Sequence, residues 1–334
     1  MRKKKNIELP FSFPMLATFH NTALVGIISN NDPNAKIQMF NQCTSLSCSK
    51  KFLGGYSTPE MGFAHSWLFN YGNLDIIKVS MQFAYKCHRD IARAMLEEGR
   101  YVYFNNIDDY YIPNKSWYNE RHMLHDGIIC GCDDSDDTYS VAAYDKNWVF
   151  RLFKVKRKFF DEAIEKSFAM GMPAFFGCKS KGETVELDIV KIAKDMQTYV
   201  NSDLSIYPNN GDTESYVSGA AVNDYIAIYI DKLLDESIPY EKMDWRVVRV
   251  IWEFRACMLE RIKALENKLA IDDNSSEAYR DIVLKTDRLR MMYAVCHKKR
   301  NDQALISVRD GLKELVKKER EILAAFVTVM EGKI

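Results

Sequence analysis

A histidine and an aspartate about twenty positions apart are the residues of this chain best placed to do chemistry together. His125 begins a segment that alternates as a strand does, and Asp145 ends a second such segment. The residues between them, 133–137, are turn formers, so the two strand ends should meet. A carboxylate that accepts a proton from one imidazole nitrogen leaves the other nitrogen as a general base, although the same spacing also suits a surface ion pair.

The overall composition excludes several classes of protein. The 334 residues include 46 basic and 46 acidic side chains, and this zero net charge argues against a general nucleic-acid binder. No stretch approaches the roughly 18 apolar residues of a membrane span, and no apolar run follows the basic start Met1–Lys5. Eight cysteines without regular paired spacing fit a reduced cytosolic protein. We therefore expect a cytoplasmic protein that binds neither nucleic acid nor a membrane.

The first half of the chain predicts helices and strands in alternation. Phe19, Ala23 and Ile27 recur every four residues, which predicts a buried helix that starts at Thr18 and stops near residues 30–33. A capping box at residues 57–60 predicts a second helix that runs to about residue 71. Further strands are predicted over residues 74–81, 100–105 and 148–155, and further helices over 83–98 and 156–168.

Strand patterns stop near Val185, and helical patterns follow. Long helices are predicted to begin near Asp244, Asn274 and Asn301, with apolar steps of three and four that are typical of an antiparallel bundle and with Leu289 inside. We therefore expect an α+β domain with a mostly antiparallel sheet over residues 1–182 and a helical bundle over 183–334. A helix followed by a sheet that carries histidine and aspartate is the order of a papain-like fold, whose nucleophile begins the first long helix.

Four short motifs resemble those of a known family. They are Asp-Asp-Tyr-Tyr-Ile-Pro at 108–113, His-Met-Leu-His at 122–125, Gly-Cys-Asp-Asp at 131–134 and Tyr-Asp at 144–145. With the first helix and the trailing helical region, most of the chain resembles the N-terminal domain of butirosin biosynthesis protein H and its relatives. This family is a branch of the cysteine-protease superfamily close to C39 peptidases.

The resemblance implies a reaction and roles for individual residues. Such proteins move an acyl or aminoacyl group from a carrier-protein thioester to an amine, so the expected partners are a carrier protein that bears a phosphopantetheine thioester and a small-molecule amine. His125 would be the general base and Asp145 the residue that orients it. His20, Asn21 and His122 would contact substrate. No ATP is needed, because the thioester is already activated, and no metal and no cofactor are expected.

The expected nucleophile is where the chain departs from this family. The family pattern has a cysteine at the start of the first helix, and Thr18 stands there. A threonine hydroxyl is a much weaker nucleophile than a thiol at neutral pH. Cys43, which follows a glutamine, is the nearest alternative, although it could equally be a small buried side chain. Three possibilities stay open: Thr18, Cys43, or no covalent nucleophile.

Three functions compete on this basis. The first is acyl transfer or amide synthesis in natural-product biosynthesis. The second is a catalytically degenerate homologue that holds a carrier protein or a partner enzyme, which the Thr18 substitution favours. The third is a cysteine peptidase, which the helical region and the missing signal sequence disfavour.

Overall fold

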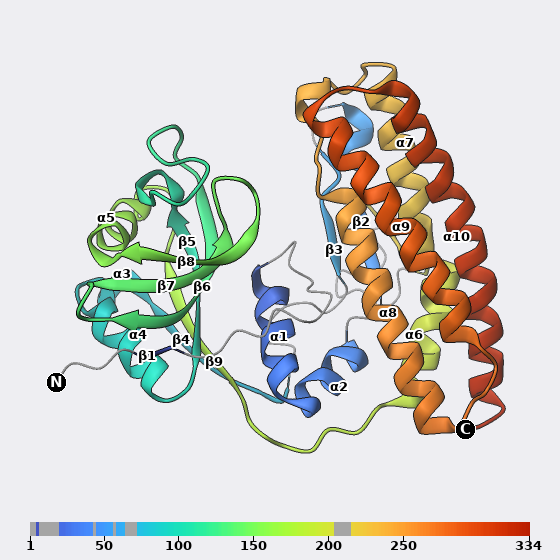
Figure 1. Cartoon of the computed structure of the whole chain (residues 1–334), viewed down its shortest axis with the longest axis horizontal. Coiled ribbons are helices and arrows are strands. Elements are labelled where there is room, and N and C mark those ends of the chain that lie inside the picture. Colours follow the sequence, from blue (N-terminus) through green and yellow to red (C-terminus); the bar gives the residue numbers. More distant parts are fainter. Residues whose placement is uncertain (1–4, 7–19, 43–44, 56–57, 64–71, 204–214) are drawn as a thin grey trace. The chain divides into compact units, whose positions relative to one another are not determined.

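The computed structural model describes residues 5–6, 20–42, 45–55, 58–63, 72–203 and 215–334. As predicted, the chain is α+β with antiparallel sheets and a C-terminal helical region (Figure 1). It divides into two compact units: the sheet unit, Met1–Lys36 with Trp67–Val185, and the helical unit, Ile37–Ser66 with Glu186–Ile334. The division predicted at residue 182 differs from this arrangement, because it left residues 37–66 with the sheet.

A seven-stranded sheet forms the centre of the sheet unit, and every pairing in it is antiparallel. In spatial order the main strands are β4 (Leu74–Ser80), β9 (Ala174–Ser180), β5 (Tyr101–Asp108), β6 (Leu124–Asp133), β7 (Thr138–Tyr144) and β8 (Phe150–Lys156), and β1 (Lys5–Asn6) pairs with β6. The predicted hairpin is β6–β7, which turns where the acidic residues stand.

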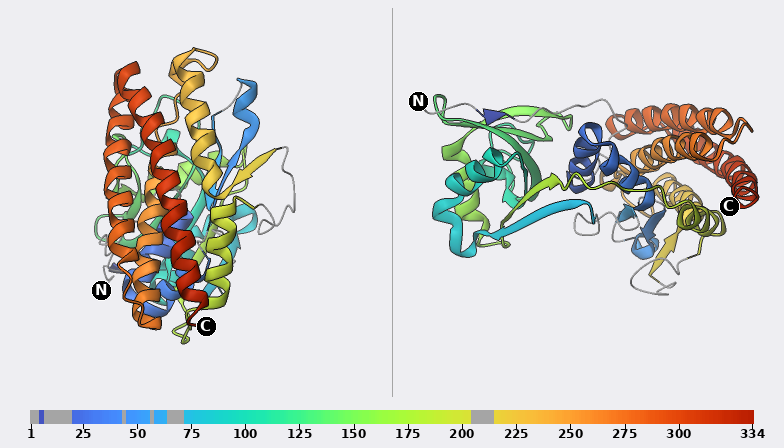
Figure 2. Two further views of the ribbon diagram at one scale, coloured as in Figure 1. Left: turned by 90° about the vertical axis from the view of Figure 1, so that its right-hand side faces the viewer. Right: turned by 90° about the horizontal axis from the view of Figure 1, so that it is seen from below.

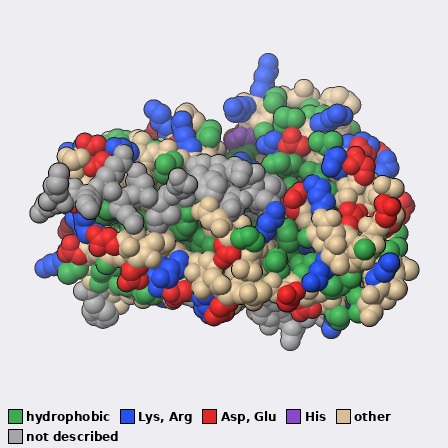
Figure 3. All heavy atoms as spheres, turned by 60° about the horizontal axis from the view of Figure 1, so that its bottom comes forward, with side chains coloured by type: hydrophobic (Ala, Val, Ile, Leu, Met, Phe, Trp, Pro, Cys, Tyr) green, Lys and Arg blue, Asp and Glu red, His purple; other side chains and the backbone are tan. Residues whose placement is uncertain are grey.

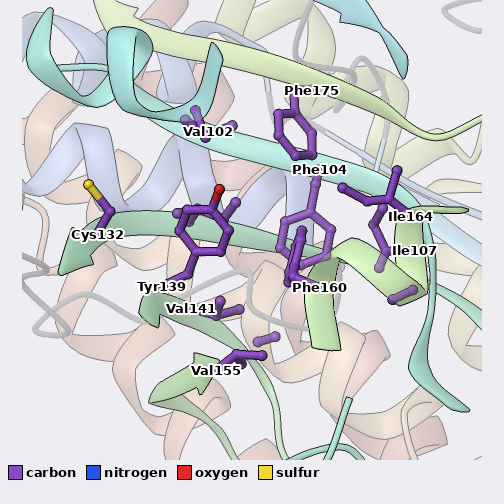
Figure 4. Packing of buried hydrophobic residues seen from close by; sticks show 14 of the residues in the cluster. Val102, Phe104, Ile107, Cys132, Tyr139, Val141, Val155, Phe160, Ile164 and Phe175 are labelled. Carbon is purple, nitrogen blue, oxygen red and sulfur yellow. The ribbon is translucent and has the colours of Figure 1, made fainter. Parts of the chain in front are cut away.

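One face of this sheet packs against helices α4 (His88–Glu97) and α5 (Arg157–Ser167). Alternate strand residues point to that face, as the two-residue period of a strand requires. Phe104, Phe160 and Phe175 meet at its centre (Figure 4). Two short turns of helix, α3 (Met81–Ala84) and η3 (Tyr85–Cys87), lead from β4 into α4.

Helix α1 (His20–Asn31) contacts β5 and β6 from the opposite face of the sheet. Asn31 Nδ2 donates a hydrogen bond of 3.2 Å to the hydroxyl of Tyr101, which precedes the core residue Val102 and therefore points away from the core of α4 and α5. The predicted end of this helix is confirmed. Asp32 then accepts from the amide of Asn34 at 2.9 Å, in the first turn of α2 (Pro33–Gln42).

The helical unit is built from five main helices, of which the longest lie side by side (Figures 1 and 2). They are α6 (Ile189–Asn201), α7 (Val222–Leu234), α8 (Val247–Leu269), α9 (Ser275–Lys298) and α10 (Asp302–Glu331). The predicted stripe of α9 is buried at Tyr279, Ile282 and Tyr293. Leu289 is half-buried and lies against Gly311 of α10.

A small three-stranded sheet also belongs to the helical unit. Its order is β10 (Tyr216–Ser218), β2 (Leu46–Ser49) and β3 (Met61–Phe63). The helix predicted over residues 57–71 is therefore wrong at Met61–Phe63, because pairing with β2 overrides the local capping signal. Residues 64–71 of that prediction lie outside the described residues.

Charged side chains of both signs are mixed over the face shown in Figure 3, in keeping with the zero net charge. Among the helices that the structure describes, none is both long enough and apolar enough to cross a membrane.

Candidate active site

The end of β5 positions two consecutive carboxylates beside the start of β6. The β5–β6 register shifts between Phe104 and Ile107, a bulge that re-aims the residues after it. Ile107 is then paired with His125. Asp108 ends the strand and Asp109 begins the short helix η4 (Asp109–Tyr111). Because β5 and β6 are neighbours in the sheet, these carboxylates lie next to the histidines that precede and begin β6.

Asp109 holds the predicted base, His125. The Nδ1 of His125 donates to Asp109 Oδ2, and Lys115 Nζ lies 3.4 Å from the other oxygen, Asp109 Oδ1. The side chains of Asp109 and Lys115 are only 4% and 5% exposed, whereas that of His125 is 32% exposed. A bond at Nδ1 fixes the tautomer and leaves Nε2 as the basic nitrogen. The arrangement is a histidine oriented by a buried carboxylate, and Lys115 balances that carboxylate's charge.

His122 is bound by Asp108 in the same way as His125 is bound by Asp109. Its Nδ1 donates to Asp108 Oδ2 at 2.7 Å, and the fully buried Asp108 also accepts from the backbone amides of Tyr110 and Met123, each at 3.1 Å. The imidazole stacks on the Tyr110 ring with centroids 4.3 Å apart. The side chain of His122 remains 53% exposed, so a residue predicted to contact substrate is both fixed and accessible.

A third carboxylate, Asp126, follows His125 in the chain. The hydroxyl of Tyr103 donates to Asp126 Oδ2 at 2.6 Å. Burial raises the pKa of the Asp126 carboxyl, while the hydrogen bond from Tyr103 and the nearby charges of His125 and Lys115 oppose that rise. A carboxyl group whose pKa is raised can carry a proton closer to neutral pH, so Asp126 is a further candidate for acid–base chemistry.

Asp145 does not pair with His125, so the predicted pairing is corrected. Its Oδ1 accepts from the backbone amides of Asn147 and Val149 at 2.8 and 3.0 Å, and its Oδ2 pairs with Arg151. The carboxylate thus stabilises the β7–β8 turn, in which Trp148 has a positive φ of 59°. Asp109 contacts His125 where Asp145 was expected to do so. It directly follows β5, and β5 pairs with β6, the strand that carries His125.

The predicted nucleophiles, Thr18 and Cys43, both lie outside the described residues. His20 and Asn21 are the first residues of α1, and their side chains are likewise not described. From the predicted set, the structure pairs His125 with Asp109 and His122 with Asp108, two consecutive carboxylates.

Buried cysteines elsewhere in the described chain are poor nucleophiles. Burial raises the pKa of the thiols of Cys48, Cys130 and Cys178 to about 12 each. Such thiols are protonated at neutral pH and inert. Among the described residues, no group of three or more histidine, cysteine, aspartate or glutamate side chains could hold a metal ion.

The prediction from the sequence missed Asp109, Lys115, Asp126 and Tyr103. Asp109 stands in one of the motifs that carry the family resemblance, and this was its signal, but no role was attached to it. Lys115 gives no signal in the sequence, because its burial beside Asp109 depends on the path of the segment after η4. Asp126 gives no signal in the sequence either, because a carboxylate in an alternating strand is normally solvated.

Comparison with known proteins adds no identification: no protein-family model matches the chain, and no curated protein matches it significantly.

Proposed function

We propose that the sheet unit is a papain-like domain that transfers an acyl or aminoacyl group from a carrier-protein thioester to an amine. The observation that carries this proposal is the half-exposed His125 oriented by the buried carboxylate of Asp109. A carboxylate bond at Nδ1 fixes the tautomer in which Nε2 can act as a base. The proposal places the protein in the cytoplasm with its carrier protein, in a pathway that makes natural products.

In this reaction the amine nitrogen attacks the thioester carbonyl and the C–S bond breaks. His125 Nε2 takes the proton that the amine loses and delivers it to the departing thiolate, so that an amide and a free thiol are formed. Where a hydroxyl or thiol of the protein attacks first, the same nitrogen takes the proton of that group. Asp109 keeps the imidazole in one tautomer and stabilises its protonated form.

A catalytically degenerate binding protein is the second candidate. Two observations favour it: Thr18 stands where the family pattern has its cysteine, and the described buried thiols have raised pKa values. In this case His122 and His125 would contact a carrier protein or a partner enzyme without chemistry.

Intact-mass analysis with a reactive acyl thioester and an amine separates the two candidates. We expect wild type to form the amide and His125→Ala to lose at least about 100-fold in rate. Arg151→Gln, an exposed change at the β7–β8 turn, is the matched control and should keep most of the rate. Complete inactivity of wild type would contradict the transferase proposal.

Variants of the two possible nucleophiles refine the result. An acyl adduct on wild type that survives Cys43→Ala and disappears in His125→Ala would identify Thr18. An adduct that Cys43→Ala removes would identify Cys43. If only Thr18→Cys becomes acylated, the site has lost covalent catalysis and the binding function is favoured.

A further inference from the structure

Helix α9 has apolar side chains on two opposite sides, and only one of these sides packs within the helical unit. Its inner side is buried, and the helix is flanked by α8 and α10 (Figure 1). On the opposite side, Leu284 is 56% exposed, Met291 49% and Val295 65%. A single exposed apolar residue is normal, whereas three on one side of one helix indicate a contact surface.

The three residues belong to a regular line along α9. The line consists of residues 281, 284, 288, 291, 295 and 298, which we call the outer stripe, and all six are exposed. Their alternating steps of three and four are the pattern by which one helix packs along another in a coiled coil. The outer stripe therefore has the spacing of a helix–helix contact in addition to its apolar residues.

The neighbouring helix α10 shows the usual solvent-facing side of a helix in the same unit. Over Asp302–Glu331, the exposed residues are polar or charged except Ala325, and no large apolar side chain is exposed. Because α10 is the longer of the two helices, length alone does not explain the apolar residues of α9. The outer stripe is thus a specific feature of α9.

The two ends of α9 carry opposite charges. Residues 272–281 contain four acidic side chains and one basic side chain, whereas residues 288–300 contain five lysine or arginine side chains and no acidic one. These charges also suit the dipole of the helix itself. A second helix with the same charges would meet repulsion if it packed in parallel, but attraction if it packed antiparallel. The charge pattern of α9 is therefore complementary to itself.

We propose that the outer stripe binds the outer stripe of a second copy of this chain, as an antiparallel pair of helices with two-fold symmetry. In the register that joins the acidic and basic ends, Leu284 faces Val295 of the second copy and Asp281 faces Lys298 of the second copy. Each contact occurs twice, because the interface is symmetric. The contact is independent of the chemistry proposed for His125.

The middle of this register is compatible with the one charge that it contains. Arg288 lies beside Met291 of the second copy. The aliphatic part of an arginine covers apolar surface while its guanidinium group remains in water. A lone pair of helices forms an interface at the small end of the known range. We therefore expect a dimer that dissociates on dilution.

Sedimentation velocity of the full chain over a series of concentrations tests the association. Val295→Glu places a charge in the apolar part of the contact and should weaken dimerisation about 10-fold or more. Because Val295 is exposed in one copy, this variant should fold normally. Val190→Glu on α6 is the matched control, since Val190 is 63% exposed and lies outside the stripe. A monomer at all concentrations up to about 200 µM overturns the proposal.

Disulfide trapping tests the antiparallel register. Leu284→Cys and Val295→Cys are made separately in a Cys87→Ser background, which removes an exposed thiol. A mixture of the two variants should form a disulfide between positions 284 and 295, located by peptide mapping. Neither variant alone should do so, because identical positions lie eleven residues apart along the axis, about 16 Å. Cross-linking of each variant with itself, or a dimer without any cross-link in the mixture, overturns the proposal.

Exchange of the terminal charges adds an independent test. Asp281→Lys and Lys298→Asp should each weaken dimerisation about 3-fold or more, because each places like charges opposite one another. The double variant should restore the wild-type affinity, and a double variant as weak as the single ones contradicts the proposed contact. A chain that remains monomeric, but whose urea midpoint falls in Val295→Glu, would show that the same chain covers the outer stripe, which also overturns the proposal.

Discussion

The two units each bury a carboxylate beside a cation, but they differ in what the carboxylate holds next. In the sheet unit, Asp109 pairs with Lys115 and then orients His125, whose side chain is 32% exposed. In the helical unit, Glu319 of α10 pairs with Arg255 of α8 at 2.6 Å, and both are fully buried. The buried carboxylate of the sheet unit thus contacts a partly exposed histidine, whereas that of the helical unit contacts only buried residues.

The partners of the Arg255–Glu319 pair complete this contrast. Arg255 Nη1 donates to Thr286 at 2.8 Å, Arg255 Nη2 to Asn223 at 3.2 Å, and the Tyr279 hydroxyl to Glu319 at 2.5 Å. All of these residues are 0% exposed, and they come from α7, α8, α9 and α10. A closed network of this kind links helices and has no atom left for a ligand. The two polar clusters therefore differ in exposure: one includes a partly exposed histidine, and the other is wholly buried.

The largest expected effect comes from the carboxylate that orients His125. Asp109→Asn should lower the rate of amide formation by roughly 10²–10⁴-fold, because an amide no longer fixes the tautomer of the imidazole. Asp145→Asn should change the rate much less, since Asp145 contacts the β7–β8 turn. Initial rates with the acyl thioester and the amine measure both. A larger loss in Asp145→Asn than in Asp109→Asn would show that Asp145 approaches His125 during the reaction.

Disrupting the Arg255–Glu319 network of the helical unit should instead lower the stability of the protein. Glu319→Gln leaves Arg255 as a buried and uncompensated charge, and breaking such a pair costs about 3–5 kcal/mol. The change should appear as a lower midpoint of urea unfolding, with the amide-forming rate unchanged where the protein is folded. Glu314→Gln on the exposed side of the same helix is the control and should leave the midpoint unchanged. A loss of rate in folded Glu319→Gln would remove the distinction between the two clusters.

The smallest effect concerns Asp126 and the pH dependence of stability. Burial raises the pKa of its carboxyl in the folded protein, so the folded state holds this proton more tightly than the unfolded chain does. The resulting stability is fully present below the unfolded pKa of about 3.9 and is lost as the pH rises through the folded value. Asp126→Asn should therefore gain stability over wild type as the pH rises from about 4 to 7. An equal difference at all pH values would mean that the pKa of the Asp126 carboxyl is not raised in the folded protein.

Much of the fold could be predicted because its local signals agree with its tertiary structure. The β6–β7 hairpin, α5 and the long helices α8, α9 and α10 all have clear periodicity and recognisable ends. The strand β9 was missed because Ala174–Ser180 is a short apolar run between two helices without alternation. The strand β3 was read as a helix because a proline and a capping box preceded it.

The candidate site could be predicted only in part, for a related reason. His125 has a local signal, since it begins a strand and stands in a motif. Its partner is chosen by the pairing of β5 with β6 and by the bulge in β5, which are properties of the sheet and not of the hairpin. Asp145 satisfied the sequence argument equally well. In the structure, however, its Oδ1 accepts hydrogen bonds from the backbone amides of Asn147 and Val149 and not from His125.

The division of the chain into units also constrains how the protein can be made. The chain passes between the units after Lys36, Ser66 and Val185, so the helical unit needs an early segment and a late one. The Arg261 Nε donates to the carbonyl of Phe40 at 2.8 Å across 221 residues. At about 5–20 residues per second, a ribosome needs roughly 10–45 s to deliver the partner of that early carbonyl. During synthesis, Phe40 and β2 therefore lack their contacts with Arg261 and β10, and a truncation that ends after the sheet unit removes these contacts permanently.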